Sequence, residues 1–287
     1  MTSPLLAVEG LAKGFGGVRA IEDVSFEIHA GAVHSIIGPN GAGKTTLLNV
    51  LTGIYVPNAG QIRLAGRDLA GQAVHRFAAA GIGRTFQNLQ VFFNMTALEN
   101  VMTGRHLRER CSLLAAMLRT PALARAEGAC RELARGLLQR VGLAEYQEAR
   151  ADAMPYGALK RLEIARALAA EPQLLLLDEP AAGLNQTEAR EIDALIKRLA
   201  ADGTTVILVE HNMRLVMEVS DHVLVLDHGR KLAEGTPAQI ARDPSVIEAY
   251  LGVEEQQGQR SAPAASAPGD AVPGARAQSG AAGGSHA

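Results

Sequence analysis

The sequence predicts an α/β protein with a parallel sheet at its core, an N-terminal antiparallel β subdomain and an inserted helical subdomain. Short apolar runs at residues 33–37, 174–177 and 204–209 are typical of buried strands. Residues 5–10 and 24–29 alternate apolar and polar side chains, as half-buried antiparallel strands do. With 287 residues, of which 47% are hydrophobic, the chain can bury a sizeable core.

A glycine-rich turn joins the two alternating stretches at the N-terminal end. It holds Phe15, in a protein of which only 3% of residues are aromatic. Residue type alone allows two roles for this ring: it could stack on a nucleotide base, or it could pack beneath a hairpin.

Residues 38–46 match the phosphate-loop pattern G-x-x-x-x-G-K-[ST] in full. A strand-like run precedes the loop, and sequence suited to a helix follows it from Thr46, which is the context that the motif requires. Its glycines allow backbone N–H groups to surround an anion at the positive end of that helix. Lys44 is expected to reach the β- and γ-phosphates, and the Thr45 hydroxyl is expected to bind Mg²⁺.

Polar side chains follow three further strand-like runs. Asp178 and Glu179 end a run of four leucines, so we expect Asp178 to hold Mg²⁺ and Glu179 to polarise the attacking water. Gln87 follows residues 81–86 and could offer an oxygen to Mg²⁺ and an amide to that water. His211 follows residues 204–209 and could donate to the γ-phosphate.

The segment from Thr96 to Glu148 is rich in Ala, Leu, Arg and Glu, with apolar residues at helical spacing. Pro121 and Gly128 are expected to separate its helices.

Composition argues against several classes of function. The net charge of −2 shows no basic excess that would indicate nucleic-acid binding. Two cysteines without metal-type spacing fit reduced thiols better than a disulfide framework. No apolar run reaches the about 18 residues of a membrane span, so any membrane role is expected to come through a partner.

The order of these motifs resembles that of an ABC transporter nucleotide-binding subunit, over residues 5 to about 252. The resemblance implies a P-loop NTPase fold with a RecA-like core, ATPase activity, and a head-to-tail dimer with ATP between its subunits. It implies that Phe15 stacks on adenine, that Glu179 is the catalytic carboxylate and that Gln87 and His211 assist it. The expected cofactors are ATP and Mg²⁺. The residues expected to bind the nucleotide are Phe15, Gly38, Asn40, Gly41, Gly43, Lys44, Thr45, Thr46 and Gly157.

Residues 154–158 stand where this family usually has the signature L-S-G-G-Q. Only Gly157 matches its core, since Pro155 replaces the serine and Ala158 replaces the glutamine. A helix beginning near Leu159 could still aim its positive end at a phosphate in the partner's site. The missing hydroxyl makes this chain's contribution to that site weaker.

Several short segments are similar to those of the LivG-type ATPases of branched-chain amino-acid importers. They are residues 84–88, 155–166, 181–185 and 243–252. This resemblance implies a second, LivF-like ATP-binding subunit or a homodimer, two transmembrane permease subunits and an extracytoplasmic substrate-binding protein. It implies a peripheral location at the cytoplasmic face of the inner membrane. The alternatives are a urea or amide importer, a lipid-export system and an ABC ATPase without a transport role.

The predicted domains follow from these assignments. Residues 1–253 form the nucleotide-binding domain, with a helical subdomain at about 96–165 and a C-terminal family segment at about 230–253. Residues 254–287 are almost wholly Ala, Gly, Ser, Pro, Gln and Arg, so they cannot bury a core and are expected to be disordered.

Overall fold

The computed structural model describes residues 3–108 and 121–250. The expected disordered tail therefore lies outside the described residues, as does Cys111, whereas Cys130 is buried. No helix in the described ranges is long and apolar enough to cross a membrane.

The central sheet has six strands in the order β10-β9-β3-β8-β7-β6. Five of them run parallel: β3 (Val33–Ile37), β6 (Ile82–Arg84), β7 (Leu174–Asp178), β8 (Thr205–Val209) and β9 (His222–Asp227). The sixth, β10 (Arg230–Gly235), pairs with β9 in the antiparallel sense. This is the parallel core that the sequence predicts.

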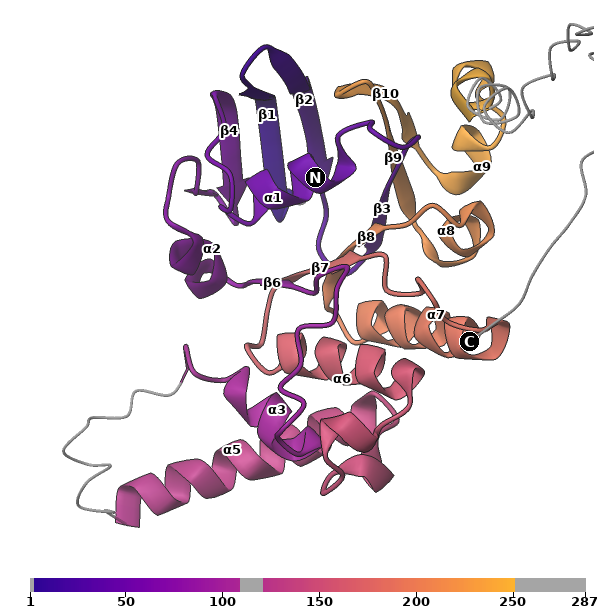
Figure 1. The fold of residues 1–287 in the computed structure, drawn as a ribbon. Helices are drawn as coiled ribbons and strands as arrows, with labels where there is room; N and C mark the ends of the chain where they lie inside the picture. The colour runs from indigo at the N-terminus through magenta and orange to yellow at the C-terminus, as the bar shows by residue number, and fades with distance from the viewer. Residues whose placement is uncertain (1–2, 109–120, 251–287) are drawn as a thin grey trace, which may run out of the picture.

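A second, antiparallel sheet has the order β2-β1-β4-β5. It contains β1 (Leu6–Phe15), β2 (Val18–Ile28), β4 (Ala59–Leu64) and β5 (Arg67–Asp68). Figure 1 shows this sheet and α1 (Lys44–Leu51) on one side of the central sheet. The predicted N-terminal β subdomain is thus present, with longer strands than the alternation alone indicates.

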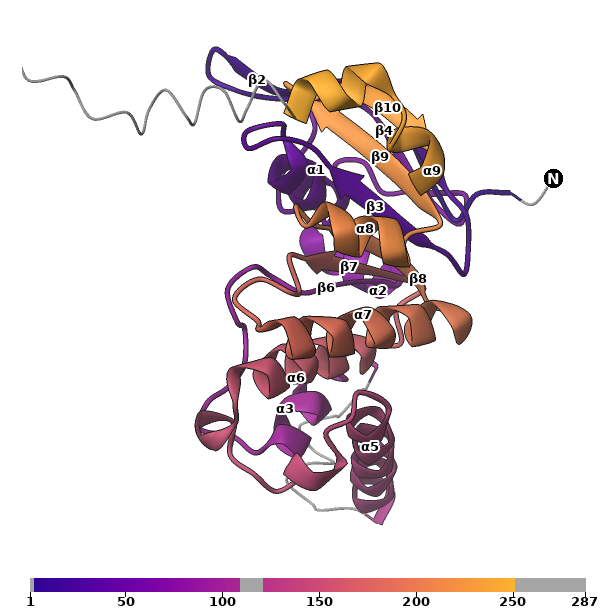
Figure 2. The same ribbon diagram turned by 90° about the vertical axis from the view of Figure 1, so that its right-hand side faces the viewer.

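The helical segment lies at the opposite end of the molecule, as both views show (Figures 1 and 2). It contains α3 (Ala97–Thr103), α5 (Pro121–Arg140), the first part of α6 (Tyr156–Leu168) and two short 3₁₀ turns, Ala144–Tyr146 and Ala151–Ala153. The expected break at Gly128 is wrong, because this residue lies inside α5. Pro121 begins α5, where its missing N–H costs nothing.

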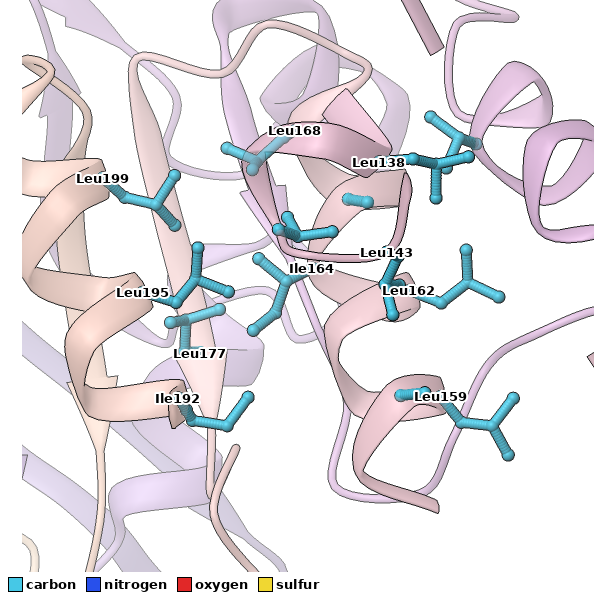
Figure 3. Close-up of a cluster of buried hydrophobic side chains, with 14 of the residues drawn as sticks. Leu138, Leu143, Leu159, Leu162, Ile164, Leu168, Leu177, Ile192, Leu195 and Leu199 are labelled. Atoms are coloured by element: carbon cyan, nitrogen blue, oxygen red, sulfur yellow. The ribbon is translucent and has the colours of Figure 1, made fainter. Parts of the chain in front are cut away.

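The remaining helices are α2 (Val74–Ala80), α7 (Gln186–Ala201), α8 (Met213–Val219) and α9 (Pro237–Ile240). Helix α7 begins with a capping box, in which Asn185 accepts from the N–H groups of Thr187 and Glu188. Figure 3 shows leucine and isoleucine side chains of α6 and α7 meeting across the end of β7. The helical segment therefore shares its core with one face of the central sheet.

Strand β7 explains why a run of four leucines is needed. Leu174 and Leu176 join the core beneath α1 and the antiparallel sheet, whereas Leu175 and Leu177 join the core beneath α6 and α7. Successive side chains of a strand point to opposite faces, and both faces of this sheet are covered. The same burial places the polar end of β7 at a fixed point of the sheet's edge.

Candidate functional site

The candidate site lies at the carboxyl edge of the central sheet. Strands β3, β8, β7 and β6 are adjacent and parallel, so the residues that follow them emerge at one edge. These residues are the phosphate loop after β3, Glu210 and His211 after β8, Asp178 and Glu179 at the end of β7, and Gln87 after β6.

The phosphate loop requires glycine where its backbone approaches other strands. A Cβ at Gly38 would lie 2.1 Å from the Leu226 carbonyl oxygen, and one at Gly43 would lie 2.5 Å from the Ala20 carbonyl oxygen. Gly38, Gly41 and Gly43 all have positive φ angles, of 150°, 83° and 100°. At Gly41 a Cβ would meet no atom within 4 Å, so the loop is open there. Close packing thus fixes the loop on two sides and leaves a third free for a ligand.

Helix α1 begins at Lys44, two residues earlier than the sequence predicts. Gly43 stands at its N-cap without a side-chain hydrogen bond, and no acidic residue lies in the first turn. The amide groups at this end are therefore uncapped by side chains, which suits an anion. Thr45 and Asn40 are exposed beside this end, and Thr46 is half-buried.

Lys44 folds back onto the loop. Its Nζ donates to the carbonyl oxygens of Gly38, at 2.6 Å, and Pro39, at 3.0 Å. Burial lowers the pKa of Lys44, and the negative charges of Glu179 and Asp178 act in the opposite direction. A buried ammonium at an open glycine loop is a fitting partner for phosphate oxygens.

Gln87 and His211 both contact the Glu179 carboxylate. Gln87 Nε2 donates to Glu179 Oε2 at 3.2 Å, and His211 Nδ1 lies 3.5 Å from Glu179 Oε1. Glu179 itself adopts a φ of 47°, in the left-handed region that favours glycine, and its N–H donates to the Val209 carbonyl oxygen at 2.9 Å. Three residues predicted from separate motifs therefore meet at one carboxylate.

Asp178 is buried at the end of β7. Its Oδ2 accepts from Arg84 Nη2 at 3.0 Å, and both side chains are 6% exposed. No group of three His, Cys, Asp or Glu residues within 3–108 and 121–250 is arranged to hold a metal ion. Mg²⁺ commonly binds through one or two protein oxygens together with nucleotide phosphates, so Thr45, Asp178 and Gln87 fit such a site without a full protein cage.

Glu210 is a site residue to which sequence reasoning assigned no role. Its carboxylate is buried and accepts from the N–H groups of Ala181, at 3.1 Å, and His211, at 3.3 Å. Burial raises the pKa of Glu210, although these two hydrogen bonds oppose the shift. Glu210 therefore holds the backbone just after Glu179, at Ala181, and the backbone at His211. The sequence feature that could have indicated a site role for Glu210 is its position directly after the apolar strand β8.

Two charged residues of α6 hold the backbone around Gln87. Lys160 Nζ donates to the Gln87 carbonyl oxygen at 3.2 Å, and Glu163 Oε1 accepts from the Phe86 N–H at 3.2 Å. Both side chains are buried. Burial raises the pKa of Glu163, while the Phe86 N–H and the charge of Lys160 lower it. The sequence offered only a weak signal, namely charged residues on a helix flanked by apolar ones.

Two predicted residues lie apart from this cluster. Phe15 is 43% exposed at the β1–β2 turn, where its ring meets Tyr55 edge-on at a centroid distance of 5.1 Å. Gly157 lies in the first turn of α6, which begins at Tyr156 and not near Leu159. A Cβ at Gly157 would lie 2.7 Å from Glu188 Oε1, and the Tyr156 ring lies against Gly183. The contacts of Gly157 are thus with the residues that begin α7.

The stretch after α9 packs against the phosphate loop. Gly38, Asn40 and His211 line a hollow of about 590 Å³ together with Met217 and Tyr250. Burial raises the pKa of Tyr250 to about 12. The C-terminal part of the described chain therefore reaches the candidate site.

Comparisons with known proteins find close relatives of the whole described chain. A family model described as "ABC transporter" matches residues 21–182, and one described as "Branched-chain amino acid ATP-binding cassette transporter" matches residues 230–256. The chain is 46% identical to the high-affinity branched-chain amino acid transport ATP-binding protein BraF of Pseudomonas aeruginosa, over 88% of this chain and 99% of that protein. It is 44% identical to LivG of Escherichia coli over the same shares.

Solved structures give the same result. A nucleotide-free ATP-binding cassette from an ABC transporter superposes with a TM-score of 0.75 at 31% identity, covering 86% of this chain and 99% of that one. The ADP conformation of an ATP-binding cassette of an ABC transporter gives a TM-score of 0.75 at 31% identity, covering 88% and 100%.

Proposed function

This chain belongs to the ABC transporter family of ATP-binding proteins, and we propose that it is the ATP-hydrolysing subunit of an importer for branched-chain amino acids. The meeting of Gln87 and His211 at the Glu179 carboxylate, within electrostatic reach of Lys44, is the observation that carries the ATPase assignment. The choice of solute rests on the relatives, since an ATP-binding subunit does not touch the solute.

The residues divide the work of hydrolysis as follows. Lys44, the loop amides and the start of α1 bind the phosphates, with the ring of Phe15 as the support for adenine. Thr45, Asp178 and Gln87 would hold Mg²⁺, which would neutralise phosphate charge. Glu179 takes a proton from the attacking water, and Gln87 and His211 fix the orientation of its carboxylate.

The variant Glu179→Gln tests this division. It keeps the shape of the side chain but removes the base, so nucleotide binding is expected to persist while turnover falls by about 100-fold or more. Fluorescent-nucleotide titration and phosphate release on the full chain measure the two effects. Glu145→Ala, at an exposed glutamate remote from the site, is the control. Steady hydrolysis by Glu179→Gln would remove Glu179 from this role.

A groove beside the site supports docking of a membrane permease. It has a volume of about 720 Å³ and runs between the central sheet and the helical segment, with Ile54, Val74, Phe86, Phe92 and Leu107 among its lining residues. These five side chains are exposed although they are large and apolar. The occupant we propose is a cytoplasmic helix of a permease subunit, because the relatives are transport ATP-binding proteins.

Charged residues in the groove are expected to uncouple transport from hydrolysis. Val74→Asp and Leu107→Asp should abolish uptake by cells that express the whole importer, while the isolated chain keeps its nucleotide binding. Val56→Asp is a matched control, since Val56 is equally exposed but does not line the groove. Normal uptake with both groove variants would exclude this surface as the docking site.

We propose the whole set of partners and the location on the same grounds. The partners are a second, LivF-like ATP-binding subunit, two permease subunits and an extracytoplasmic substrate-binding protein, and this chain is peripheral to the cytoplasmic face of the membrane. Uptake of labelled leucine, isoleucine and valine in a deletion strain tests the solute. Loss of urea uptake with unchanged leucine uptake would overturn the choice of branched-chain amino acids.

A further inference from the structure

Arg84 ends β6 and links three elements of the site. Its Nη2 donates to Asp178 Oδ2 at 3.0 Å, and its Nη1 donates to Asn49 Oδ1 at 2.7 Å and to Thr52 Oγ1 at 3.1 Å. Asn49 and Thr52 lie at the end of the helix that begins in the phosphate loop. One guanidinium therefore ties β6 to β7 and to α1.

Stability alone does not account for this pair. Taking a guanidinium and a carboxylate out of water costs about as much as their attraction returns, so a buried ion pair is weak support for a fold. The Arg84 Nε–H is also buried and has no hydrogen-bond partner among the described residues. What the rigid, planar guanidinium does supply is position, because it holds one oxygen of Asp178 with Nη2 while Nη1 is held by Asn49 and Thr52.

The other side of Arg84 faces the groove. The guanidinium carbon lies 4.8 Å from the centre of the Phe86 ring, and Phe86 is 39% exposed. Both Arg84 and Phe86 line the groove. The same side chain thus contacts a groove residue and the carboxylate that we assign to Mg²⁺.

We infer that Arg84 is a positioning residue, which holds the Asp178 carboxylate for the metal and links its position to the Phe86 ring in the groove. This inference rests on the proposed function, since it concerns how the carboxylate of the ATPase site is held in position. A permease helix that binds in the groove and moves the Phe86 ring would also move the Arg84 guanidinium that packs on it. The hydrogen bond from Arg84 to Asp178 would change as a result. Gln87 hydrogen-bonds to Glu179, so the contact of Arg84 with Asp178 is a second connection between this part of the chain and the two acids.

Metal affinity, measured apart from turnover, tests the positioning role. Mn²⁺ is titrated by electron paramagnetic resonance into the full chain loaded with ADP. Arg84→Met is expected to weaken Mn²⁺ binding by about 10- to 100-fold, as is usual for the loss of a group that orients a metal ligand. Arg84→Lys keeps the charge but not the planar guanidinium, so partial rescue is expected.

Controls separate this role from unfolding and from a general effect of the groove. Arg84→Met leaves the buried Asp178 carboxylate without its partner and should lower the unfolding temperature, so the Mn²⁺ titration is done well below that temperature. ADP binding in EDTA should stay close to that of the wild type in both Arg84 variants, which shows that the nucleotide site is still folded. Arg166→Met removes another arginine that lines the groove, one that lies over Phe92, and should leave Mn²⁺ affinity unchanged. Unchanged or tighter Mn²⁺ binding by Arg84→Met would overturn the positioning role. A wild-type chain that binds no ADP would contradict the proposed function instead.

The link to the groove has its own test in the same titration. Phe86→Ala removes the ring beneath the guanidinium and is expected to weaken Mn²⁺ binding several-fold, less than Arg84→Met does. Phe92→Ala is the matched control, because Phe92 is a groove phenylalanine that packs on Arg166. Equal Mn²⁺ affinities for Phe86→Ala and the wild type would refute the link and leave only the contact to Asp178.

Discussion

Glu210 is fully buried yet carries no role in the chemistry that we assign. It accepts hydrogen bonds from the Ala181 N–H, two residues after Glu179, and from the N–H of His211, the next residue in the chain. Glu210→Ala would remove the charged acceptor of these two part-buried N–H groups, so it should cost about 1–3 kcal/mol of unfolding free energy. Turnover should fall as well, since His211 loses its fixed backbone. Urea unfolding and phosphate release measure the two effects.

The matched variant is Glu210→Gln, which keeps an oxygen for one of the two amides, since Ala181 and His211 donate to different oxygens of Glu210. A smaller loss of stability than in Glu210→Ala is expected. If the two variants were equally destabilised, the hydrogen bonds could not be the reason for the effect.

His34 is a second buried titratable residue, in β3, 8% exposed and with its ring centroid 5.8 Å from that of His222. Burial lowers the pKa of His34 to about 4, and repulsion from His222 acts in the same direction. In the unfolded chain the group titrates near its ordinary value of 6.5. Between these values the unfolded chain binds the proton and the folded chain does not, so stability falls as the pH is lowered.

The expected loss is on the order of 3 kcal/mol between pH 6.5 and pH 4, with His34 contributing no such loss above that range. His34→Gln should remove this part of the pH dependence, whereas His75→Gln, at an exposed histidine, should not. Urea unfolding at pH 7 and pH 4.5 measures the difference. If the unfolding free energy changed with pH equally in His34→Gln and in the wild type, His34 could not be the cause of the loss of stability at low pH.

At the scale of single elements, α5 shows how the pattern of apolar residues outweighs a glycine. Gly128 is exposed inside α5, and a Cβ there would meet no atom within 4 Å. Cys130, Ala134 and Leu138 are buried on one side of the helix, so packing holds the helix together through the glycine. Gly128→Ala should therefore stabilise the protein by about 0.5–1 kcal/mol.

The shift of the urea unfolding midpoint measures the effect of Gly128→Ala. Gly43→Ala is the contrasting variant and should destabilise the protein, because the alanine Cβ would lie 2.5 Å from the Ala20 carbonyl oxygen. A destabilised Gly128→Ala would mean that α5 is strained at this point.

The elements that could be predicted from the sequence are those whose signal lies within a few neighbouring residues. The phosphate loop, the leucine strand β7 and the acids that end it are of this kind. Arg84, Lys160 and Glu163 could not be placed, because each acts on a partner far along the chain, 94, 73 and 77 positions away respectively. Their role depends on how β6, β7 and α6 pack, which no local pattern contains.

The same reason explains the boundaries that the sequence predicted incorrectly. Helix α6 begins at Tyr156 because Pro155 stands at its N-cap with an extended backbone, whereas we expected the helix to begin near Leu159. Residue type alone gave Phe15 two roles, because the exposure of its ring depends on how Tyr55, 40 positions along the chain, packs against it.

At the scale of the whole molecule, the start of α6 bears on how subunits are combined. Pro155 at its N-cap provides no side-chain hydrogen bond, and Ala158 is buried. If this end faces the nucleotide of a second subunit, it offers backbone groups but no hydroxyl. We therefore predict that a mixed dimer with a LivF-like subunit hydrolyses ATP faster than this chain alone.

Restoring the missing hydroxyl tests that prediction. Pro155→Ser restores the hydroxyl at an exposed position and should raise the rate of the isolated chain by about tenfold, since a hydrogen bond to a charged group contributes roughly 1.5–3 kcal/mol. Ala158 is left unchanged, because it is buried in the core and has no room for a glutamine. Phosphate release at saturating ATP is the readout. Full activity of the unaltered chain as a homodimer would count against a mixed assembly.

The left-handed backbone of Glu179 sets a limit on how robust this protein can become. A glycine at that position would relieve a conformation that costs a non-glycine residue roughly 1 kcal/mol or more. It would also delete the carboxylate at which Gln87 and His211 meet. A selection for thermal stability alone would therefore favour glycine at this position, and the selected protein would not hydrolyse ATP. Stability and activity thus make opposite demands on the backbone conformation of one residue.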